Sequence, residues 1–382
     1  MAAKKNVPEI RFKGFEGDWE NIKLTDIYNF QYGYFNNNPS DGGQYPVYGA
    51  NGIIGKYSKY NAESSVVIGH MGEYAGSVIW AEGKHFVTYN GTISTVKNDR
   101  INSKYGFYLL SKLNINKICG GSGQPFLSYD TLEKIQSNIS TSIPEQTQIG
   151  TYFQNLDSLI TLHQRKYNKL LTVKKAMLEK MFPKEDADVP EIRFKGFEGK
   201  WEKKKLGEIS DSYSGGTPSV ANRDYYNGKI PFIRSGEINS NSTGLSLSEY
   251  GLKNSSAKIV DIGDILYALY GATSGEVGRA QLTGAINQAI LSIRPHSNYD
   301  SEFIMHWLRK QKQNIICTYL QGGQGNLSGA IVKDLVLYVP TIEEQNKIGT
   351  FFQNLDTLIT QHQKELEKLK NLKKACLEKM FV

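Results

Sequence analysis

The sequence predicts an α+β protein with two α/β domains in tandem, separated by two long helices that pair as an antiparallel coiled coil. Three observations carry this prediction: a short segment that occurs twice, a longer helical block that occurs twice, and two unlike segments between these copies. At 382 residues the chain is too long for one ordinary core. The duplication makes two domains the natural number and predicts a pseudo-twofold internal repeat.

The short segment opens each half of the chain. Residues 7–17, Val-Pro-Glu-Ile-Arg-Phe-Lys-Gly-Phe-Glu-Gly, return unchanged as residues 189–199. A protein that repeats its frame and varies what the frame holds presents two related but different binding surfaces.

The helical block closes each half. Residues 149–182 and 348–381 are identical at 23 of 34 positions. Apolar residues and a histidine recur every seven residues in both copies: Leu156, His163, Leu170 and Met177, then Leu355, His362, Leu369 and Cys376. A second row is expected beside them: Leu159, Lys166, Val173 and Lys180, then Ile359, Leu366, Leu372 and Met380. Sustained heptad spacing predicts long helices that pair as a coiled coil. A helix from Pro144 to Phe182 would be about 58 Å long.

The two intervening segments, about 20–143 and 202–342, predict strands with loops. Short runs such as Ser65–Ile68 and Asp264–Tyr267 alternate with Gly, Asn and Ser turns. Helices are expected at Lys104–Asn114 and Ser301–Gln313. Residues 72–78 resemble 271–277, and residues 123–128 resemble 323–328, so both segments are expected to share one fold. The predicted domains are therefore 1–143 and 185–342, each followed by a spacer helix, 144–184 and 343–382.

Composition narrows the class of protein. No apolar run approaches the length of a membrane span, and the N-terminus lacks a signal-peptide pattern, so a cytoplasmic protein is expected. The three cysteines are scattered and form neither a disulfide framework nor a zinc motif. The net charge of +7 fits a polyanionic partner, although many soluble proteins are equally basic.

Motifs for catalysis are missing. The sequence has no phosphate-binding Gly-x-x-x-x-Gly-Lys-Ser/Thr loop. It has no Asn/Asp-Pro-Pro-aromatic box of the amino-methyltransferases, and the nearest segment, residues 37–40, lacks the second proline and the aromatic residue. The six histidines show no metal-ligand spacing. No catalytic, cofactor-binding or metal-binding residue is predicted.

What remains is a set of side chains suited to nucleic acid. Lys and Arg neutralise phosphates, whereas Asn, Gln, Ser and Arg form directional bonds to base edges. In the first segment the candidates are Lys56, Tyr57, Lys59, Tyr60, His70, Tyr74, Tyr89, Asn90 and Gln124. In the second they are Thr217, Ser219, Arg223, Arg234, Ser235, Tyr270, Thr273, Arg279, Asn287, Gln288 and Gln324. Each alone also fits an ordinary loop residue, and the clustering in both halves favours a binding role.

Several short motifs add to the repeat. They are 45–55 in the first half and Gly-Gly-Thr-Pro-Ser (215–219), Ile-Pro-Phe-Ile (230–233), 270–275, Asn-Gln-Ala-Ile (287–290) and Pro340 with Glu343-Glu344-Gln345 in the second. Together with the repeated segments, these motifs resemble the specificity (S) subunit of type I restriction–modification enzymes. The first half has Tyr34-Phe35-Asn36-Asn37-Asn38-Pro39-Ser40 in place of the Gly-Gly-Thr-Pro-Ser version, which suggests unlike targets for the two domains.

The resemblance implies a non-catalytic subunit with two target recognition domains, each reading one half of a bipartite, asymmetric site in double-stranded DNA. It also implies two methylation subunits, which use S-adenosylmethionine to methylate adenine, and two restriction subunits, which use ATP and Mg²⁺. Two alternatives stay open: a methyltransferase or nuclease that works alone, and a tandem binding scaffold built on a coiled coil.

Overall fold

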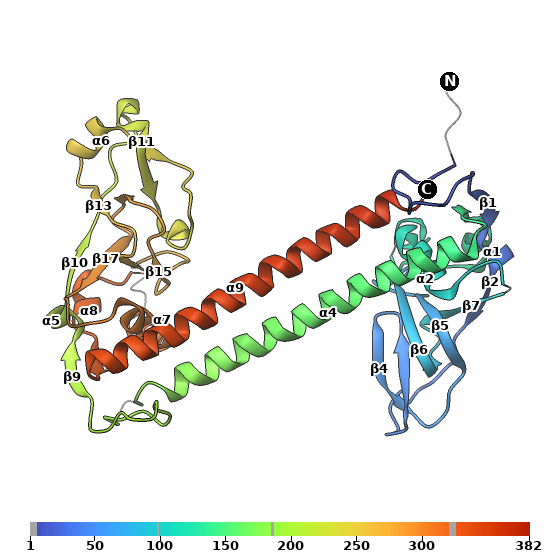
Figure 1. The fold of residues 1–382 in the computed structure, drawn as a ribbon, viewed down its shortest axis with the longest axis horizontal. Helices are drawn as coiled ribbons and strands as arrows, with labels where there is room; N and C mark the ends of the chain where they lie inside the picture. Colours follow the sequence, from blue (N-terminus) through green and yellow to red (C-terminus); the bar gives the residue numbers. More distant parts are fainter. Residues whose placement is uncertain (1–5, 98, 122, 185–186, 321–325) are drawn as a thin grey trace. The chain divides into compact units, whose positions relative to one another are not determined.

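A computed structural model describes residues 6–97, 99–121, 123–184, 187–320 and 326–382. The chain divides into two compact units. The first unit contains residues 1–165 and 363–382, and the second contains residues 166–362. Each unit therefore holds one α/β domain together with one end of each long helix (Figure 1). The predicted fold class is confirmed.

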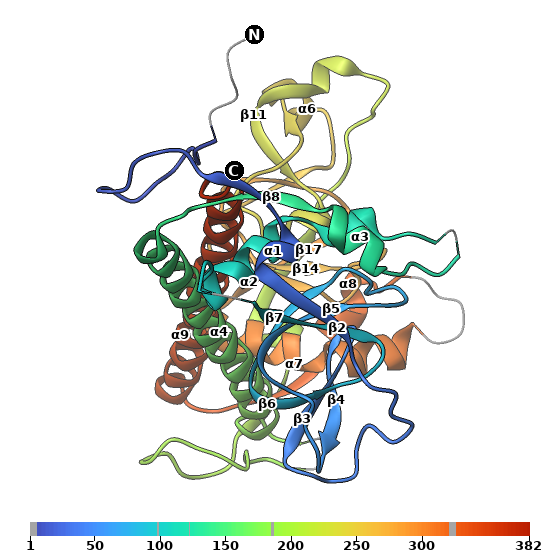
Figure 2. The same ribbon diagram turned by 90° about the vertical axis from the view of Figure 1, so that its right-hand side faces the viewer.

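The first unit is built on a six-stranded sheet in the order β2-β7-β5-β6-β3-β4, in which only β3 and β6 pair in parallel. A separate two-stranded sheet pairs β1 with β8. Figure 2, in which this unit faces the viewer, shows β2, β7 and β5 side by side. Its elements are β1 (Glu20–Lys23), α1 (Leu24–Ile27), β2 (Tyr28–Tyr32), β3 (Tyr45–Gly49), β4 (Gly52–Tyr57), β5 (Ala62–Gly69), β6 (Val78–Val87), β7 (Gly91–Val96), α2 (Ser103–Lys112), the 3₁₀ helix Ile115–Ile118, α3 (Tyr129–Lys134) and β8 (Gln136–Ile139).

The second unit repeats this topology with its main sheet divided in two, β10-β17-β14-β15 and β12-β11-β16-β13, and it also has a separate two-stranded sheet, β18-β9. Its elements are β9 (Glu202–Lys205), α5 (Leu206–Ile209), β10 (Ser210–Ser214), the 3₁₀ helix Arg223–Tyr225, β11 (Tyr226–Ile233), the 3₁₀ helix Ser235–Glu237, β12 (Ser246–Leu247), α6 (Glu249–Lys253), β13 (Lys258–Val260), β14 (Ile265–Ala268), β15 (Val277–Arg279), β16 (Gly284–Ile286), β17 (Ile290–Pro295), α7 (Ser301–Tyr319), α8 (Gly329–Lys333) and β18 (Val336–Val339).

Strand registers show that the two units share one fold, as the sequence predicts. In the first unit β3 and β6 pair in parallel with Tyr48 opposite Val87. In the second, β11 and β16 pair in parallel with Ile233 opposite Ile286. The long strand β6 of the first unit corresponds to β15 and β16, which are two short strands in the second. The expected strands and helices are present as β5, β14, α2 and α7, and α7 is longer than expected.

The long helices α4 (Ile143–Lys180) and α9 (Ile342–Lys379) pair antiparallel within each unit. In the first unit Tyr152 contacts Cys376 and Asp157 contacts Lys373, so the partner number falls as the α4 number rises. In the second unit Lys174 binds Asp356. Phenylalanines near both ends of the helix pair are buried in the domain cores. Phe153 stacks on Phe381 in the first unit and Phe182 on Phe352 in the second, both pairs with ring centroids 6.0 Å apart.

The predicted second row of the coiled coil is wrong in part. Leu159 is 44% exposed and Leu372 is 42% exposed, whereas Ile359, Leu366 and Met380 are buried. A pair of helices covers only one stripe on each partner, and the rest of each surface stays open.

Candidate nucleic-acid interface

Four chain segments meet at one end of the main sheet in the first unit. They are the last residue of β2 and those that follow it, the residues that follow β5, those that precede β7, and those that precede α3 with its first residue; we call this region the loop end. His70 connects them, because its amide donates to Asn90 O at 2.8 Å and its carbonyl accepts from Leu127 N at 2.8 Å. Met71 and Phe126 form an isolated β-bridge beside it. Residues far apart in the sequence are thus held together by backbone hydrogen bonds.

The second unit has the same skeleton at its own loop end. Leu269 N donates to Ala289 O at 2.8 Å, and Leu327 N donates to Leu269 O at 2.8 Å. Tyr270 and Asn326 form the isolated bridge. The equivalence assigns each loop-end position of one unit a counterpart in the other, so their side chains can be compared directly.

A glycine allows a close backbone approach in each loop end. A Cβ atom on Gly33 would lie 2.1 Å from Thr88 O, and one on Gly215 would lie 1.8 Å from Ile286 O. Neither distance is possible for a real side chain. Gly215 opens the Gly-Gly-Thr-Pro-Ser motif, so this motif has a structural reason to begin with glycine.

In the first unit the loop end is aromatic. Tyr32 stacks on Tyr129 with centroids 4.0 Å apart and lies 4.0 Å from the His70 ring. Tyr89 meets His70 edge-on at 5.3 Å. Burial lowers the pKa of His70, which favours the neutral imidazole. Of these four, His70 and Tyr89 were predicted from the sequence, whereas Tyr32 and Tyr129 were missed.

In the second unit the loop end is polar. Thr217 Oγ1 donates to Gln288 Oε1 at 2.6 Å, and Tyr270 Oη donates to Gln288 O at 2.5 Å. Asn287 Oδ1 accepts from Ala289 N at 3.1 Å. The structure thus brings together Thr217, Tyr270, Asn287 and Gln288, all of them sequence candidates. An amide and hydroxyls in a fixed arrangement are suited to hydrogen bonding with base edges.

The remaining candidates of the first unit lie in two places. Tyr74 and Asn90 belong to the loop end, and Gln124 lies in the loop that precedes Phe126. Lys56 and Tyr57 lie on β4, and Lys59 and Tyr60 lie in the turn before β5. His70 follows the 8-residue strand β5. Since a strand rises about 3.3 Å per residue, β5 is about 26 Å long, and it lies between the turn with Lys59 and Tyr60 and the loop end.

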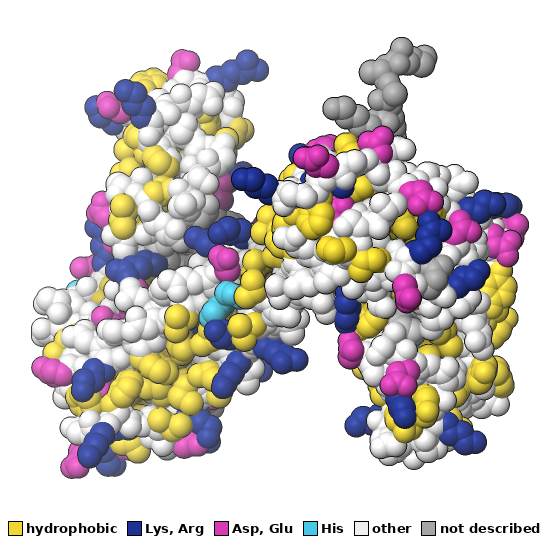
Figure 3. All heavy atoms as spheres, turned by 45° about the vertical axis from the view of Figure 1, so that its right-hand side comes forward, with side chains coloured by type: hydrophobic (Ala, Val, Ile, Leu, Met, Phe, Trp, Pro, Cys, Tyr) yellow, Lys and Arg dark blue, Asp and Glu magenta, His cyan; other side chains and the backbone are white. Residues whose placement is uncertain are grey.

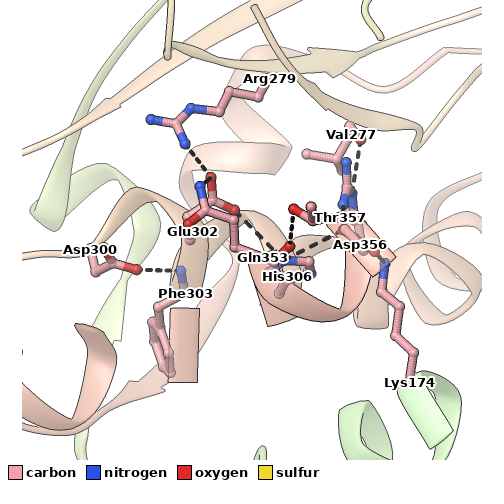
Figure 4. Close-up of polar contacts among 11 residues, drawn as sticks. Lys174, Val277, Arg279, Asp300, Glu302, Phe303, His306, Gln353, Asp356 and Thr357 are labelled. Carbon is pink, nitrogen blue, oxygen red and sulfur yellow. Dashed lines mark hydrogen bonds and ion pairs between the residues drawn. The ribbon is translucent and has the colours of Figure 1, made fainter. Parts of the chain in front are cut away.

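Two of the three arginines predicted in the second unit, Arg234 and Arg279, form ion pairs with carboxylates. Arg234 binds Glu237 at 2.9 Å, and this hydrogen bond lowers the pKa of Glu237 to about 2. Arg279 lies on β15 and pairs with Glu302 on α7 (Figure 4). Arg223 is exposed. Ser219 and Thr273 lie in loops, Ser235 opens the 3₁₀ helix Ser235–Glu237, and Gln324 lies outside the described residues.

Surface charge does not mark the interface on the face shown in Figure 3. There Lys and Arg side chains are scattered over both units among Asp and Glu, with hydrophobic patches between them. The loop ends are therefore identified by their shared backbone and their different side chains.

A polar cluster on the inner side of α7 in the second unit is structural in character. His306 is fully buried, with Nε2 3.7 Å from Glu302 Oε2 and 3.8 Å from Asp356 Oδ2 (Figure 4). Burial lowers the pKa of His306 to about 2, so the ring is neutral.

Within the described ranges, no group of three His, Cys, Asp or Glu residues could hold a metal ion. No helix in the described part of the chain is long and apolar enough to cross a membrane.

Comparison with known proteins identifies the family. Residues 16–172 and 198–371 match the sequence profile of the type I restriction modification DNA specificity domain. The chain belongs to this family. The two matches fall on the two domains, so the specificity domain occurs twice here, in agreement with the repeated loop end.

Specificity subunits are among the proteins it resembles. The chain is 27% identical over 190 residues to the type I restriction enzyme MjaIX specificity subunit of Methanocaldococcus jannaschii, covering 48% of this chain and 44% of that protein. It is 25% identical over 329 residues to the putative type I restriction enzyme MjaX specificity subunit of the same organism, covering 79% and 73%. The alignment with the MjaIX subunit thus spans less than half of that relative.

A solved structure shares the fold over nearly the whole chain. The S subunit of a type I restriction–modification system from M. genitalium matches with a TM-score of 0.77 and 16% identity, covering 98% of this chain and 99% of that one. The tandem arrangement of two specificity domains and two long helices is therefore that of a solved S subunit.

Proposed function

We propose that this chain is the DNA-reading subunit of a type I restriction–modification complex. Residues 1–143 read one half of a bipartite, asymmetric duplex target, and residues 185–342 read the other. The observation that carries the proposal is the repeated loop end, which keeps one backbone skeleton and presents aromatic rings in one unit and hydroxyl and amide groups in the other. Two readers with one frame and different side chains are what an asymmetric target requires.

The chain itself is proposed to have no catalytic activity. Two methylation subunits, using S-adenosylmethionine, modify adenine in the target, and two restriction subunits, using ATP and Mg²⁺, cut the DNA. The assembly acts in the cytoplasm. The family membership and the likeness to a solved S subunit support this role.

A domain exchange tests the proposal. Residues 20–143 are replaced by the equivalent segment of another family member, and the chimera is produced with the partner subunits in a host that lacks other adenine methylation. Long-read sequencing then gives the methylated motif. We expect one half of the motif to change and the other half to stay. The reciprocal exchange of residues 202–342 is the matched control and should change the other half.

An unchanged motif after both exchanges would refute the reading role.

The purified chain alone, incubated with S-adenosylmethionine and DNA, should transfer no methyl groups. Appreciable methylation would instead establish an enzyme that works alone. DNA binding by the complex should weaken steeply with salt, because phosphate contacts release counterions.

A further inference from the structure

The four aromatic residues of the first loop end have no aromatic residue at the equivalent positions of the second, whose loop end holds Tyr270 at a different position. Backbone equivalence pairs His70 with Leu269, since each joins the residues directly before β7 or β17 to the segment before α3 or α8. By the same registers, Tyr32, Tyr89 and Tyr129 correspond to Ser214, Gln288 and Gly329. None of the four equivalent positions in the second unit holds an aromatic ring, so this cluster is specific to the first unit and is not required by the shared fold.

The polar atoms of three of these rings are already bound to the backbone. Tyr129 Oη accepts from Tyr32 N at 2.7 Å, and Tyr32 Oη donates to Leu127 O at 3.4 Å. His70 Nδ1 donates to the same carbonyl at 2.8 Å. These bonds fix the orientation of the Tyr32, Tyr129 and His70 rings. The exposed rings of Tyr89 and Tyr129 offer a ligand their carbon faces and edges, beside their two hydroxyl groups.

The cluster has a buried base and an exposed rim. His70 is 5% exposed, whereas Tyr89 is 44% exposed and Tyr129 is 38% exposed. Two large rings held at the surface on a fixed base make a rigid contact surface, and rigid aromatic side chains lose little conformational freedom on binding.

We propose that Tyr89 and Tyr129 read thymine in the first half-site, through contact of their rings with the 5-methyl group in the major groove. This inference rests on the proposed function. In the major groove the thymine methyl is the apolar feature that distinguishes bases, and it is read by apolar side chains. A surface of ring carbon atoms suits this group better than the donor and acceptor atoms of the other bases. The second unit, with Thr217 and Gln288 at its loop end, reads its half-site by hydrogen bonds instead.

The test uses the complete complex and duplexes that carry its methylated motif. Each thymine is replaced in turn by deoxyuridine, which lacks only the methyl group, and Kd is measured at fixed salt. We expect binding to weaken about fourfold at one or more thymines of the first half-site, the effect of removing one methyl from an apolar contact. This scan needs no protein variant, so a variant that fails to fold does not affect it.

Variants assign the effect to the cluster. Y89Q introduces the residue type of the second unit, and Y129A removes the other exposed ring; each should abolish the difference between thymine and deoxyuridine at its position. Y250A is the matched control, because Tyr250 is an exposed tyrosine of the second unit, outside its loop end. It should leave the first half-site unaffected.

The outcomes separate this inference from the proposed function. If the complex binds its motif but no thymine of the first half-site is sensitive, or if Y89Q and Y129A keep the full discrimination, the thymine contact is refuted and the reading role stands. If no bipartite motif is bound at all, the proposed function itself fails.

Discussion

Lys373 Nζ donates a hydrogen bond of 2.5 Å to Asp157 Oδ1, joining α9 to α4 in the first unit. The copied helices place Lys174 and Asp356 at the equivalent positions, and these two residues form the same bridge in the second unit. The same Lys–Asp bridge thus joins α4 and α9 in both units. The lysine comes from α9 in the first unit and from α4 in the second.

The bridge predicts a measurable coupling. In a double-mutant cycle with K373A and D157A, we expect a coupling energy of about 1 kcal/mol, the range of a half-buried ion pair partly screened by water. Urea unfolding would measure the free energies of the single and double variants. The cycle with K174A and D356A should give a similar coupling energy, whereas D356A alone should cost more than D157A, since Arg309 also binds Asp356 at 2.9 Å. Strict additivity in both cycles would contradict a stabilising role.

The environment of this bridge differs between the units and predicts a pH dependence. Tyr108 on α2 donates to Asp157 at 2.8 Å, and His306 holds the corresponding place on α7 without a hydrogen bond from either ring nitrogen. In the folded protein the pKa of His306 is lowered to about 2, whereas in the unfolded chain it has its ordinary value of 6.5. Between these two values the histidine of the unfolded chain binds a proton and that of the folded protein does not. This contribution to stability is complete above pH 6.5 and is lost as pH falls below it.

H306F should therefore remove an acid-dependent component of about 1.4 kcal/mol per pH unit between pH 6 and 4. Denaturant unfolding of both proteins across that range would measure it. The groups that face the ring are Glu302, Asp356, Arg309 and Lys174; they remain in the variant, so the difference between the two curves isolates the histidine. Parallel curves would show that His306 does not titrate on unfolding.

Much of the fold was predictable because the chain repeats itself. Two copies of one heptad block predict two helices of equal length, and shared glycine motifs predict one fold for both domains. The exposed position of Leu159 was not predictable, since heptad spacing alone does not say that a helix has a single partner.

The candidate site was predicted only in part, for physical reasons. Thr217, Asn287 and Gln288 belong to polar motifs and were found. Tyr32 and Tyr129 were missed because the aromatic cluster joins segments whose proximity depends on strand register. Comparison of 123–129 with 323–329 could have singled out Tyr129, since glycine replaces it in the second copy. Arg279 was selected for its charge, which Glu302 neutralises from another element.

The repeated N-terminal segment is anchored by an arginine in each unit. Arg11 Nε donates to Oε1 of the fully buried Glu145 at 2.6 Å, and Arg193 Nε donates to Oε1 of the fully buried Glu344 at 2.7 Å. R11A would leave a buried carboxylate without its partner and should lower the free energy of unfolding by about 3–5 kcal/mol. R193A should do the same in the second unit.

Thermal and urea unfolding of R11A, R193A and K13A would test this anchor. Lys13 is an exposed residue of the same segment, so K13A should be within about 0.5 kcal/mol of the wild type. R11K should recover only part of the loss, because lysine cannot make the paired hydrogen bonds to both Glu145 oxygens. A mild effect of R11A, comparable with that of K13A, would contradict the anchoring role.

Gly33 and Gly215, the glycines of the two loop ends, should each be needed for recognition of one half of the DNA motif. A methyl group on Gly33 meets Thr88 O, and one on Gly215 meets Ile286 O, so the loop must shift in either alanine variant. We expect G33A and G215A each to destabilise its unit by about 1–3 kcal/mol and to weaken recognition of one half-site only. Gly123 and Gly236 have open space at the Cβ position, so G123A and G236A are the matched controls. The methylated motif of each variant, read together with its unfolding curve, checks both effects. If G33A degraded both half-sites equally while its unit stayed folded, the separate reading of the two halves would be wrong.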